Sequence, residues 1–190
     1  MNYRRDINIL TGFIVLFAMT TQFVQAGTML LFNDPIEIPV AESKLLGLDK
    51  PQLKRDWKII TFGYVHCTDI CPITLTNLKK MIEAGAKHSK SIEGIFVSLD
   101  PDRDSEEVLD RYLSNYNENI VFSRLPKAEL EKISEFFNVE YRDYNKRAGV
   151  NHYIIDHSST AFVLDSQNRL IAAFDSNKSI EDIMVLLNQS

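Results

Sequence analysis

The two cysteines of the chain, Cys67 and Cys71, lie close together in TFGYVHCTDICPITL, where an apolar run meets a segment with helical spacing. The partial positive charge of a helix N-terminus favours the thiolate form of a nearby cysteine. The chain has no further cysteine. The pair can therefore be a redox-active dithiol, a structural disulfide or a clamp for a metal ion.

The elements around the cysteines should place both sulfurs at one helix N-terminus. Residues 57–65, WKIITFGYV, are almost continuously apolar or β-branched, which predicts a buried strand. A helix should follow, with Pro72 at its first position, where the missing N–H costs nothing. Its apolar face would be formed by Leu75, Leu78, Met81 and Ile82.

The rest of the chain continues the alternation of strands and helices. IEGIFVSL, residues 92–99, predicts the next strand, and Asp104 with Glu107 resembles the capping box of a helix. The later expected elements are a helix over 126–138, a hairpin of STAFVLD and RLIAAFD turning at 166–168, and a helix from the cap Ser179 to Leu187. This order predicts an α/β fold, a thioredoxin-like sandwich with a mixed central sheet flanked by helices.

The N-terminus has the three parts of a secretory signal: the basic start MNYRRD, an apolar stretch, and VQA before Gly27. We expect 1–26 to be a signal peptide cleaved after Ala26. The alternative is an uncleaved membrane anchor, because residues 7–24 could just cross a bilayer. Either form exports the rest of the chain, and in a bacterium this predicts the periplasm, where disulfides persist.

Length and composition describe an ordinary domain. The 190 residues are 45% hydrophobic and 25% charged, so the chain can bury a normal core. The net charge of -5 argues against nucleic-acid binding. We expect residues 27–55 to form a lead-in with a short strand or hairpin, and 56–190 to form one monomeric soluble domain.

Three motifs in order resemble the Sco (SenC) copper proteins, which assist assembly of the copper site of cytochrome c oxidase. FGYVHCTDICPITL resembles the family's cysteine motif, SLDPDRDSEEVLDRYLSNY its second motif, and YIIDHSSTAFVLD the segment that carries its metal-binding histidine. The resemblance extends from about Trp57 to the C-terminus. Thr68 replaces the usual proline, and the family's glycine-rich lead-in is not recognisable in 32–55.

The resemblance implies a copper-binding metallochaperone with Cys67, Cys71 and His157 as ligands of one ion. The chemistry agrees, because thiolates select Cu(I) and an added imidazole also suits Cu(II). The implied partner is a copper-accepting oxidase subunit or another copper chaperone. Zinc is the competing metal, and a closed zinc site would need a fourth ligand from His66, Asp69 or Asp156.

A second function stays open, that of a thiol-disulfide oxidoreductase whose redox pair, Cys67 and Cys71, reduces the cysteines of the copper-site target. Thioredoxin-like reductases place a cis-proline before the strand that faces the dithiol. Here Ser159 stands at that position and His157 lies two residues earlier, which favours ligation. His66 is expected to be structural, Asp69 to be a loop or capping carboxylate, and His152 to lie near the site mouth.

Overall fold

The computed structural model describes residues 29–50, 55–144, 146, 152–176 and 180–189. The expected signal peptide or anchor at 1–26 lies outside these residues, as does the expected helix cap Ser179. None of the helices in the described ranges is long and apolar enough to cross a membrane.

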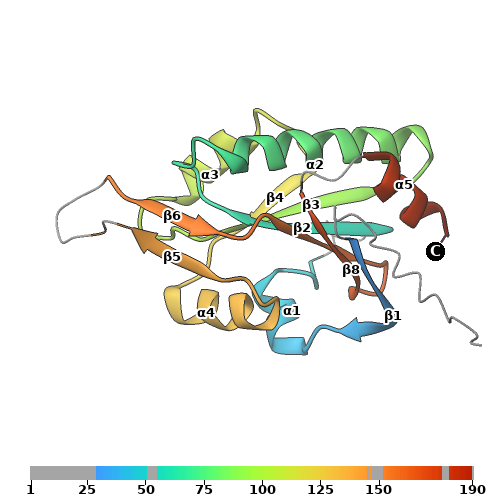
Figure 1. Cartoon of the computed structure of the whole chain (residues 1–190), viewed down its shortest axis with the longest axis horizontal. Helices are drawn as coiled ribbons and strands as arrows, with labels where there is room; N and C mark the ends of the chain where they lie inside the picture. Colours follow the sequence, from blue (N-terminus) through green and yellow to red (C-terminus); the bar gives the residue numbers. More distant parts are fainter. Residues whose placement is uncertain (1–28, 51–54, 145, 147–151, 177–179, 190) are drawn as a thin grey trace, which may run out of the picture.

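A six-stranded mixed sheet forms the centre of the protein (Figure 1). Its strand order is β1-β8-β7-β2-β3-β4. Its strands are β1 (Met29–Glu37), β2 (Trp57–Gly63), β3 (Ile92–Ser98), β4 (Ile120–Ser123), β7 (Thr160–Leu164) and β8 (Arg169–Asp175). Strands β2, β3 and β4 run parallel, whereas β7 is antiparallel to both β2 and β8.

In the described ranges, five helices cover the two faces of this sheet: α1 (Val40–Leu45), α2 (Ile70–Lys87), α3 (Glu106–Leu113), α4 (Lys127–Phe136) and α5 (Ile180–Gln189). Helices α2, α3 and α5 lie on one face, and α1 and α4 lie on the other (Figure 1). Each face has its own hydrophobic core, and every residue of β2 and β3 is buried between them. Strands that are covered on both faces have almost continuously apolar sequences, and this pattern predicted β2 and β3 as buried strands. The predicted thioredoxin-like α/β fold is confirmed.

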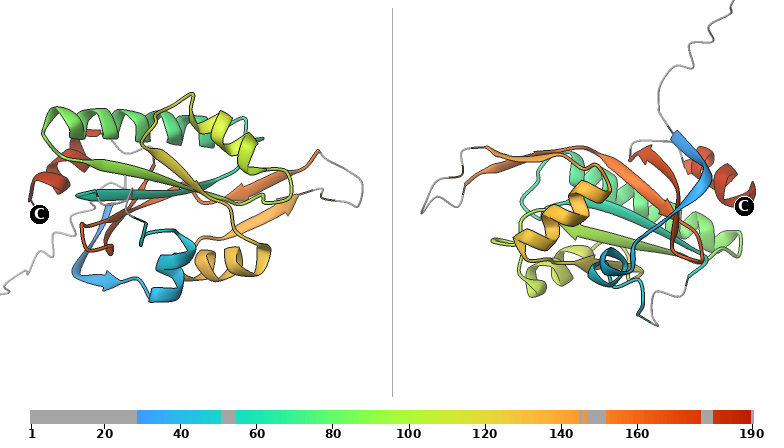
Figure 2. Two further views of the ribbon diagram at one scale, coloured as in Figure 1. Left: turned by 180° about the vertical axis from the view of Figure 1, so that it is seen from behind. Right: turned by 90° about the horizontal axis from the view of Figure 1, so that it is seen from below.

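A separate antiparallel hairpin, β5 (Tyr141–Tyr144) with β6 (Ile154–His157), projects from the body beside α4 (Figures 1 and 2). Its register pairs Tyr141 with His157. His157 is the last residue of β6 and does not lie in the loop that leads to STAFVLD. A strand end fixes the backbone more firmly than a free loop does, so the fold presents this imidazole from an ordered position.

Two helix starts differ from the sequence prediction. Helix α2 begins at Ile70, so Pro72 lies within the first turn and not at its first position. Proline is tolerated there because the first N–H groups of a helix have no intrahelical partner. Helix α3 is capped by Ser105, whose hydroxyl accepts a hydrogen bond from the Val108 N–H, and not by Asp104. Asp104 is instead buried, and its carboxylate accepts hydrogen bonds from Val65 and Ser98.

Candidate metal centre

The two cysteines lie where β2 passes into α2, at the carboxyl end of the parallel strands. The Cys67 N–H donates to the Tyr64 carbonyl at 3.2 Å, which closes a tight turn after the strand. Cys71 follows in the first turn of α2, and its N–H donates to the Cys67 sulfur at 3.4 Å. The Cys71 N–H has no partner within the helix, because it belongs to the first turn, and the Cys67 sulfur accepts its hydrogen bond instead.

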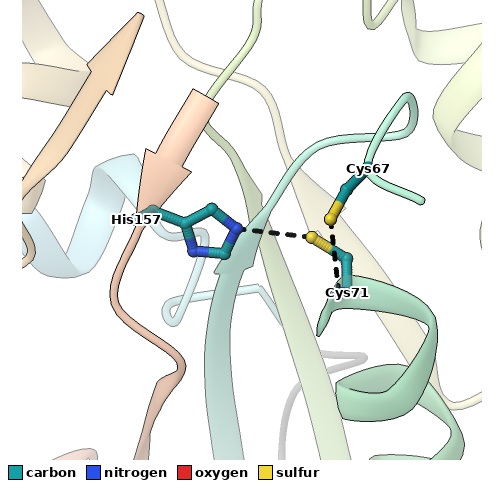
Figure 3. A group of neighbouring side chains, drawn as sticks. All are labelled: Cys67, Cys71 and His157. Carbon is teal, nitrogen blue, oxygen red and sulfur yellow. Dashed lines mark hydrogen bonds between the residues drawn. The ribbon is translucent and has the colours of Figure 1, made fainter. Parts of the chain in front are cut away.

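His157 reaches the cysteines from the end of β6 (Figure 3). Its Nε2 lies 3.4 Å from the Cys71 sulfur, and its Nδ1 lies 2.9 Å from the Ser158 carbonyl oxygen. A carbonyl only accepts, so Nδ1 carries the proton and donates it. In the neutral ring the lone pair of Nε2 then faces the sulfurs, which is the arrangement that a metal-ligating histidine needs.

The three predicted ligands form one compact group. The sulfurs of Cys67 and Cys71 and a ring nitrogen of His157 all lie within 4.8 Å of one another. Neither cysteine is in a disulfide, Cys67 and Cys71 are 8% and 1% exposed, and His157 is partly buried. Within the described parts of the chain, no fourth histidine, cysteine or carboxylate joins this group. The arrangement suits an open three-ligand site better than a closed tetrahedral zinc site.

The environment separates the acidities of the two thiols. A hydrogen bond from the Cys71 thiol, with others from the His157 ring and from the N–H groups of Cys71 and Asp69, outweighs burial and lowers the pKa of Cys67 to about 3. The same bond to Cys67, together with burial, raises the pKa of Cys71 above its ordinary value. The pair therefore holds one thiolate, on Cys67, and one thiol, on Cys71, at neutral pH.

This asymmetry predicts the pH dependence of alkylation. Only a thiolate attacks iodoacetamide, and an ordinary cysteine with a pKa near 8.5 slows about tenfold for each unit below that pH. The pKa of Cys67 is lowered, so its rate should stay nearly constant from pH 8 down to about pH 5. Cys71 should react slowly throughout. Mass spectrometry of the reduced protein at timed quench points measures both rates.

The Cys71→Ala protein is the matched comparison for this measurement. It removes the thiol that donates to Cys67, so the pKa of Cys67 should rise and its reaction at pH 5 should slow. Equal rates for the two cysteines, or a tenfold fall per pH unit for Cys67 in the unmodified protein, would contradict the assignment of the thiolate to Cys67.

Gly63 makes room for the second sulfur, a role that the sequence analysis missed. A Cβ on Gly63 would lie 2.9 Å from the Cys71 sulfur and 2.9 Å from a ring carbon of Phe96. Both neighbours are almost fully buried and have little space to move. The available signal was a glycine inside an otherwise β-branched and aromatic strand, because such a glycine often marks a close approach.

Asp104 ties the cysteine loop to the neighbouring strand. Its buried carboxylate accepts hydrogen bonds from the Val65 N–H at 3.2 Å and from the Ser98 hydroxyl at 2.7 Å. Burial raises the pKa of Asp104, and these two donors act in the opposite direction. Val65 lies two residues before Cys67, so Asp104 fixes the backbone that leads into the site.

Asp100 and Arg103 connect the loop after β3 to the segment that carries His157. Arg103 donates to the Asp100 carboxylate and to the Tyr153 carbonyl, the latter at 3.1 Å, and its guanidinium lies 3.5 Å from the centroid of the Tyr153 ring. The Tyr153 hydroxyl in turn donates to Asp100. The ion pair of Arg103 with Asp100 is local, because the two residues are three positions apart in the sequence. The contacts with Tyr153, which begins the approach to β6, extend that role.

Tyr64 joins the same two segments from the cysteine side. Its hydroxyl accepts a hydrogen bond from the Ile155 N–H at 3.3 Å, and its ring meets the His157 ring edge-on with centroids 6.1 Å apart. Together with the Arg103 contacts, this bond holds β6 against the end of β2. The imidazole and the sulfurs are therefore positioned by a shared set of buried contacts.

The remaining candidates lie outside the three-ligand group. His66 is half exposed, with Nδ1 3.9 Å from the Asp104 carboxylate, and belongs to a second cluster with Asp100 and Asp104. Asp69 is exposed at the start of α2 and makes no capping bond with its side chain. His152 and Asp156 are exposed.

This site combines a thioredoxin-like fold with two thiols and an imidazole at the carboxyl end of parallel strands. The sequence profile of the SCO1/SenC family matches residues 47–189, and the chain belongs to this family. An SCO2-like protein of Rickettsia prowazekii is 27% identical over 180 residues, which cover 92% of this chain and 87% of the relative.

Solved structures of Sco proteins have a fold similar to that of this chain. Yeast Sco1 with copper bound is 25% identical and has a TM-score of 0.64 over 78% of this chain and 81% of the yeast chain. BsSco is described as a member of the Sco family of cytochrome c oxidase assembly proteins that contains a disulfide switch. It is 17% identical, with a TM-score of 0.54 over 72% of this chain and 80% of its own, and therefore supports the fold alone.

Proposed function

We propose that this protein is an exported metallochaperone that binds one copper ion through Cys67, Cys71 and His157 and delivers it to a copper site of a terminal oxidase. The observation that carries the proposal is the compact group of two sulfurs and one ring nitrogen, all within 4.8 Å. Soft sulfur ligands favour Cu(I), and the imidazole adds the nitrogen that Cu(II) prefers. The likeness to yeast Sco1 with copper bound supports the copper part of the assignment.

The proposed transfer proceeds by ligand exchange. The target's own thiolates and imidazoles would replace Cys67, Cys71 and His157 one at a time, so the ion is never fully released. This requires fewer than four ligands and access from one side. Only three donors gather at this site in the described residues, and His157 lines an open groove.

Thiol-disulfide exchange is the second candidate, and the acidity of Cys67 favours it. The Cys67 thiolate would attack a sulfur of the target disulfide and form a mixed disulfide, releasing one target thiolate. Cys71 would then lose its proton and attack Cys67, releasing the second target thiolate. The products are a Cys67–Cys71 disulfide and a target reduced by two electrons. The disulfide switch described for BsSco is consistent with such chemistry in that protein.

The proposed location agrees with the proposed chemistry of the two thiols, because disulfides can form and persist in the periplasm. We place the protein in the periplasm, either released after cleavage at Ala26 or anchored through residues 7–24 and facing outward. A Sco-family protein of Bacillus anthracis is described as a lipoprotein, which is one form of membrane attachment in that relative. Residues 56–190 form the copper-binding domain in this proposal, and the domain is monomeric.

Copper retention by the reduced and the oxidised protein tests the two candidates against each other. The Cys67–Cys71 pair should oxidise reversibly, and the disulfide form should fail to retain Cu(I) because its sulfurs are no longer thiolates. Bound Cu(I) should in turn slow oxidation and alkylation of both thiols. Gel filtration followed by metal analysis, with alkylation trapping in parallel, measures these effects.

Equal copper retention by the two forms would exclude the coordination proposed here. If the reduced protein never retains copper but rapidly reduces a disulfide in a peptide carrying the target's cysteines, the oxidoreductase candidate replaces the metallochaperone. Thr68→Ala, which changes an exposed residue between the two cysteines, is the control for general disturbance of the loop.

A further inference from the structure

A groove of about 790 Å³ lies beside His157, between α4 and the β5–β6 hairpin. Helix α4 contributes Glu131, Ser134 and Glu135 to its lining, and the hairpin contributes Asp156 and His157. The helix and the hairpin lie next to each other in both views of Figure 2. One proposed copper ligand, His157, therefore lines the groove, whereas Cys67 and Cys71 do not.

The lining of this groove is strongly acidic. Glu131, Glu135, Glu140 and Asp156 are all exposed and all line it. One guanidinium, that of Arg142, lines it as well, and it lies opposite Asp156 in the strand register. Four carboxylates facing one guanidinium leave a negative field, and the concave shape concentrates that field within the groove.

Two hydroxyl groups of residues that line the groove have no hydrogen-bond partner among the described residues. Ser134 is 4% exposed, and its hydroxyl makes no hydrogen bond. The buried hydroxyl of Ser158, the residue after His157, also makes none. A buried hydroxyl without a partner is unfavourable, so these groups are usually satisfied by protein, water or ligand. Both residues line the groove.

The spacing of the carboxylates argues against a single metal ion as the occupant. Among the described residues, the groups that bring three donors within 4.8 Å are the proposed copper site and the cluster of His66, Asp100 and Asp104. Neither contains a carboxylate of the groove. The charges are spread along a channel, which suits a ligand with several separated positive charges and its own hydrogen-bonding groups.

We propose that this groove binds an extended, lysine- or arginine-bearing segment of the protein that receives the copper. The proposal rests on the function proposed above, because His157 lies at the edge of the groove and a segment bound there would hold the acceptor beside the metal centre. Backbone amides of the segment can bond to the hydroxyls of Ser134 and Ser158, while its cations face the carboxylates.

The probe is a fluorescein-labelled peptide of alternating lysine and glycine, measured by fluorescence anisotropy with the reduced, copper-free protein. Its glutamate counterpart should not bind. In the triple variant Glu131→Gln, Glu135→Gln, Glu140→Gln, affinity for the lysine peptide should fall about tenfold, because each exposed charge pair is worth only a fraction of the total. Asp156 is left unchanged because it is next to His157.

A matched triple variant removes the same charge from other exposed positions, through Glu83→Gln, Glu118→Gln and Glu181→Gln. Its affinity should change less than about twofold at 0.1 M salt, where charges more than about 10 Å apart are screened. Ser134→Ala should also weaken binding of the lysine peptide. Unchanged or higher affinity in this variant would show that the Ser134 hydroxyl takes no part in binding. Equal losses in the two triple variants, or no binding at all, would overturn the groove as a docking site.

A Cu(I) titration of the same proteins separates this proposal from the one that it rests on. The groove variants should keep the copper affinity of the unmodified protein, since none of the substituted residues belongs to the three-ligand group. If the unmodified protein fails to bind copper, the metallochaperone proposal fails. If copper binds normally and the lysine peptide does not, the docking proposal fails alone.

Discussion

Replacing either Cys67 or Cys71 by serine is expected to weaken Cu(I) binding by at least about a hundredfold. Loss of a residue that merely orients a metal ligand already costs about ten- to a hundredfold, so loss of the ligand should cost more. A hydroxyl has nearly the shape of a thiol but is a poor ligand for a soft ion. Competition against a Cu(I) chelator of known affinity measures the change.

Loss of copper binding in the cysteine variants can be interpreted only when each variant is shown to fold. Cys71 is 1% exposed and packs against the core, so its serine variant needs a check of folding by circular dichroism and thermal denaturation. Thr68→Ala provides the control, because it alters the same loop and keeps both sulfurs. Unmodified copper affinity in the two folded serine variants would exclude a dithiolate site.

Much of the cysteine side of the site could be predicted from the sequence. The apolar run before Cys67 and the helical spacing after Cys71 require a strand followed by a helix, and this order places both sulfurs at one junction. The helix in fact begins two residues before Pro72. That difference has little effect on the site, because Cys71 remains in the first turn. Periodicity finds an element more reliably than it finds its ends.

The histidine side was harder to predict. Strands β5 and β6 have four residues each, and all of β5 is at least partly exposed. In β6 only Ile155 is buried, so its alternation is too short to recognise in the sequence. The resemblance to a family identified His157, but the residue's own surroundings did not place it on a strand. Its position depends on contacts between distant segments, such as the bond from Ile155 to Tyr64.

Asp104 shows why local patterns can mislead. Asp104 and Ser105 are both good capping residues, and Glu107 completes a capping box when it is counted from Asp104. In the structure Ser105 caps the helix, and Asp104 is free to accept bonds from Val65 and Ser98. Val65 follows β2 and Ser98 ends β3, and the parallel pairing of these two strands brings the donors together.

Replacing His157 by alanine should affect the two oxidation states of copper differently. Two thiolates alone can hold Cu(I) in linear geometry, so Cu(I) affinity should fall only modestly. Cu(II) prefers tetragonal sites with nitrogen or oxygen ligands, so most of its affinity should be lost. The sulfur-to-copper absorption bands and the electron paramagnetic resonance spectrum should change with it. Nδ1 donates its hydrogen bond to the Ser158 carbonyl, so Nε2 is the proposed metal-binding nitrogen that the substitution removes.

The fold should survive this substitution, because His157 is only partly buried and its ring contact with Tyr64 is worth about 1 kcal/mol. His66→Ala and His152→Ala are the controls, since neither residue belongs to the three-ligand group. Both should keep the Cu(II) spectra of the unmodified protein. Unchanged spectra in a folded His157→Ala protein would exclude His157 as a ligand. A changed spectrum in His66→Ala would instead direct attention to the neighbouring cluster with Asp100 and Asp104.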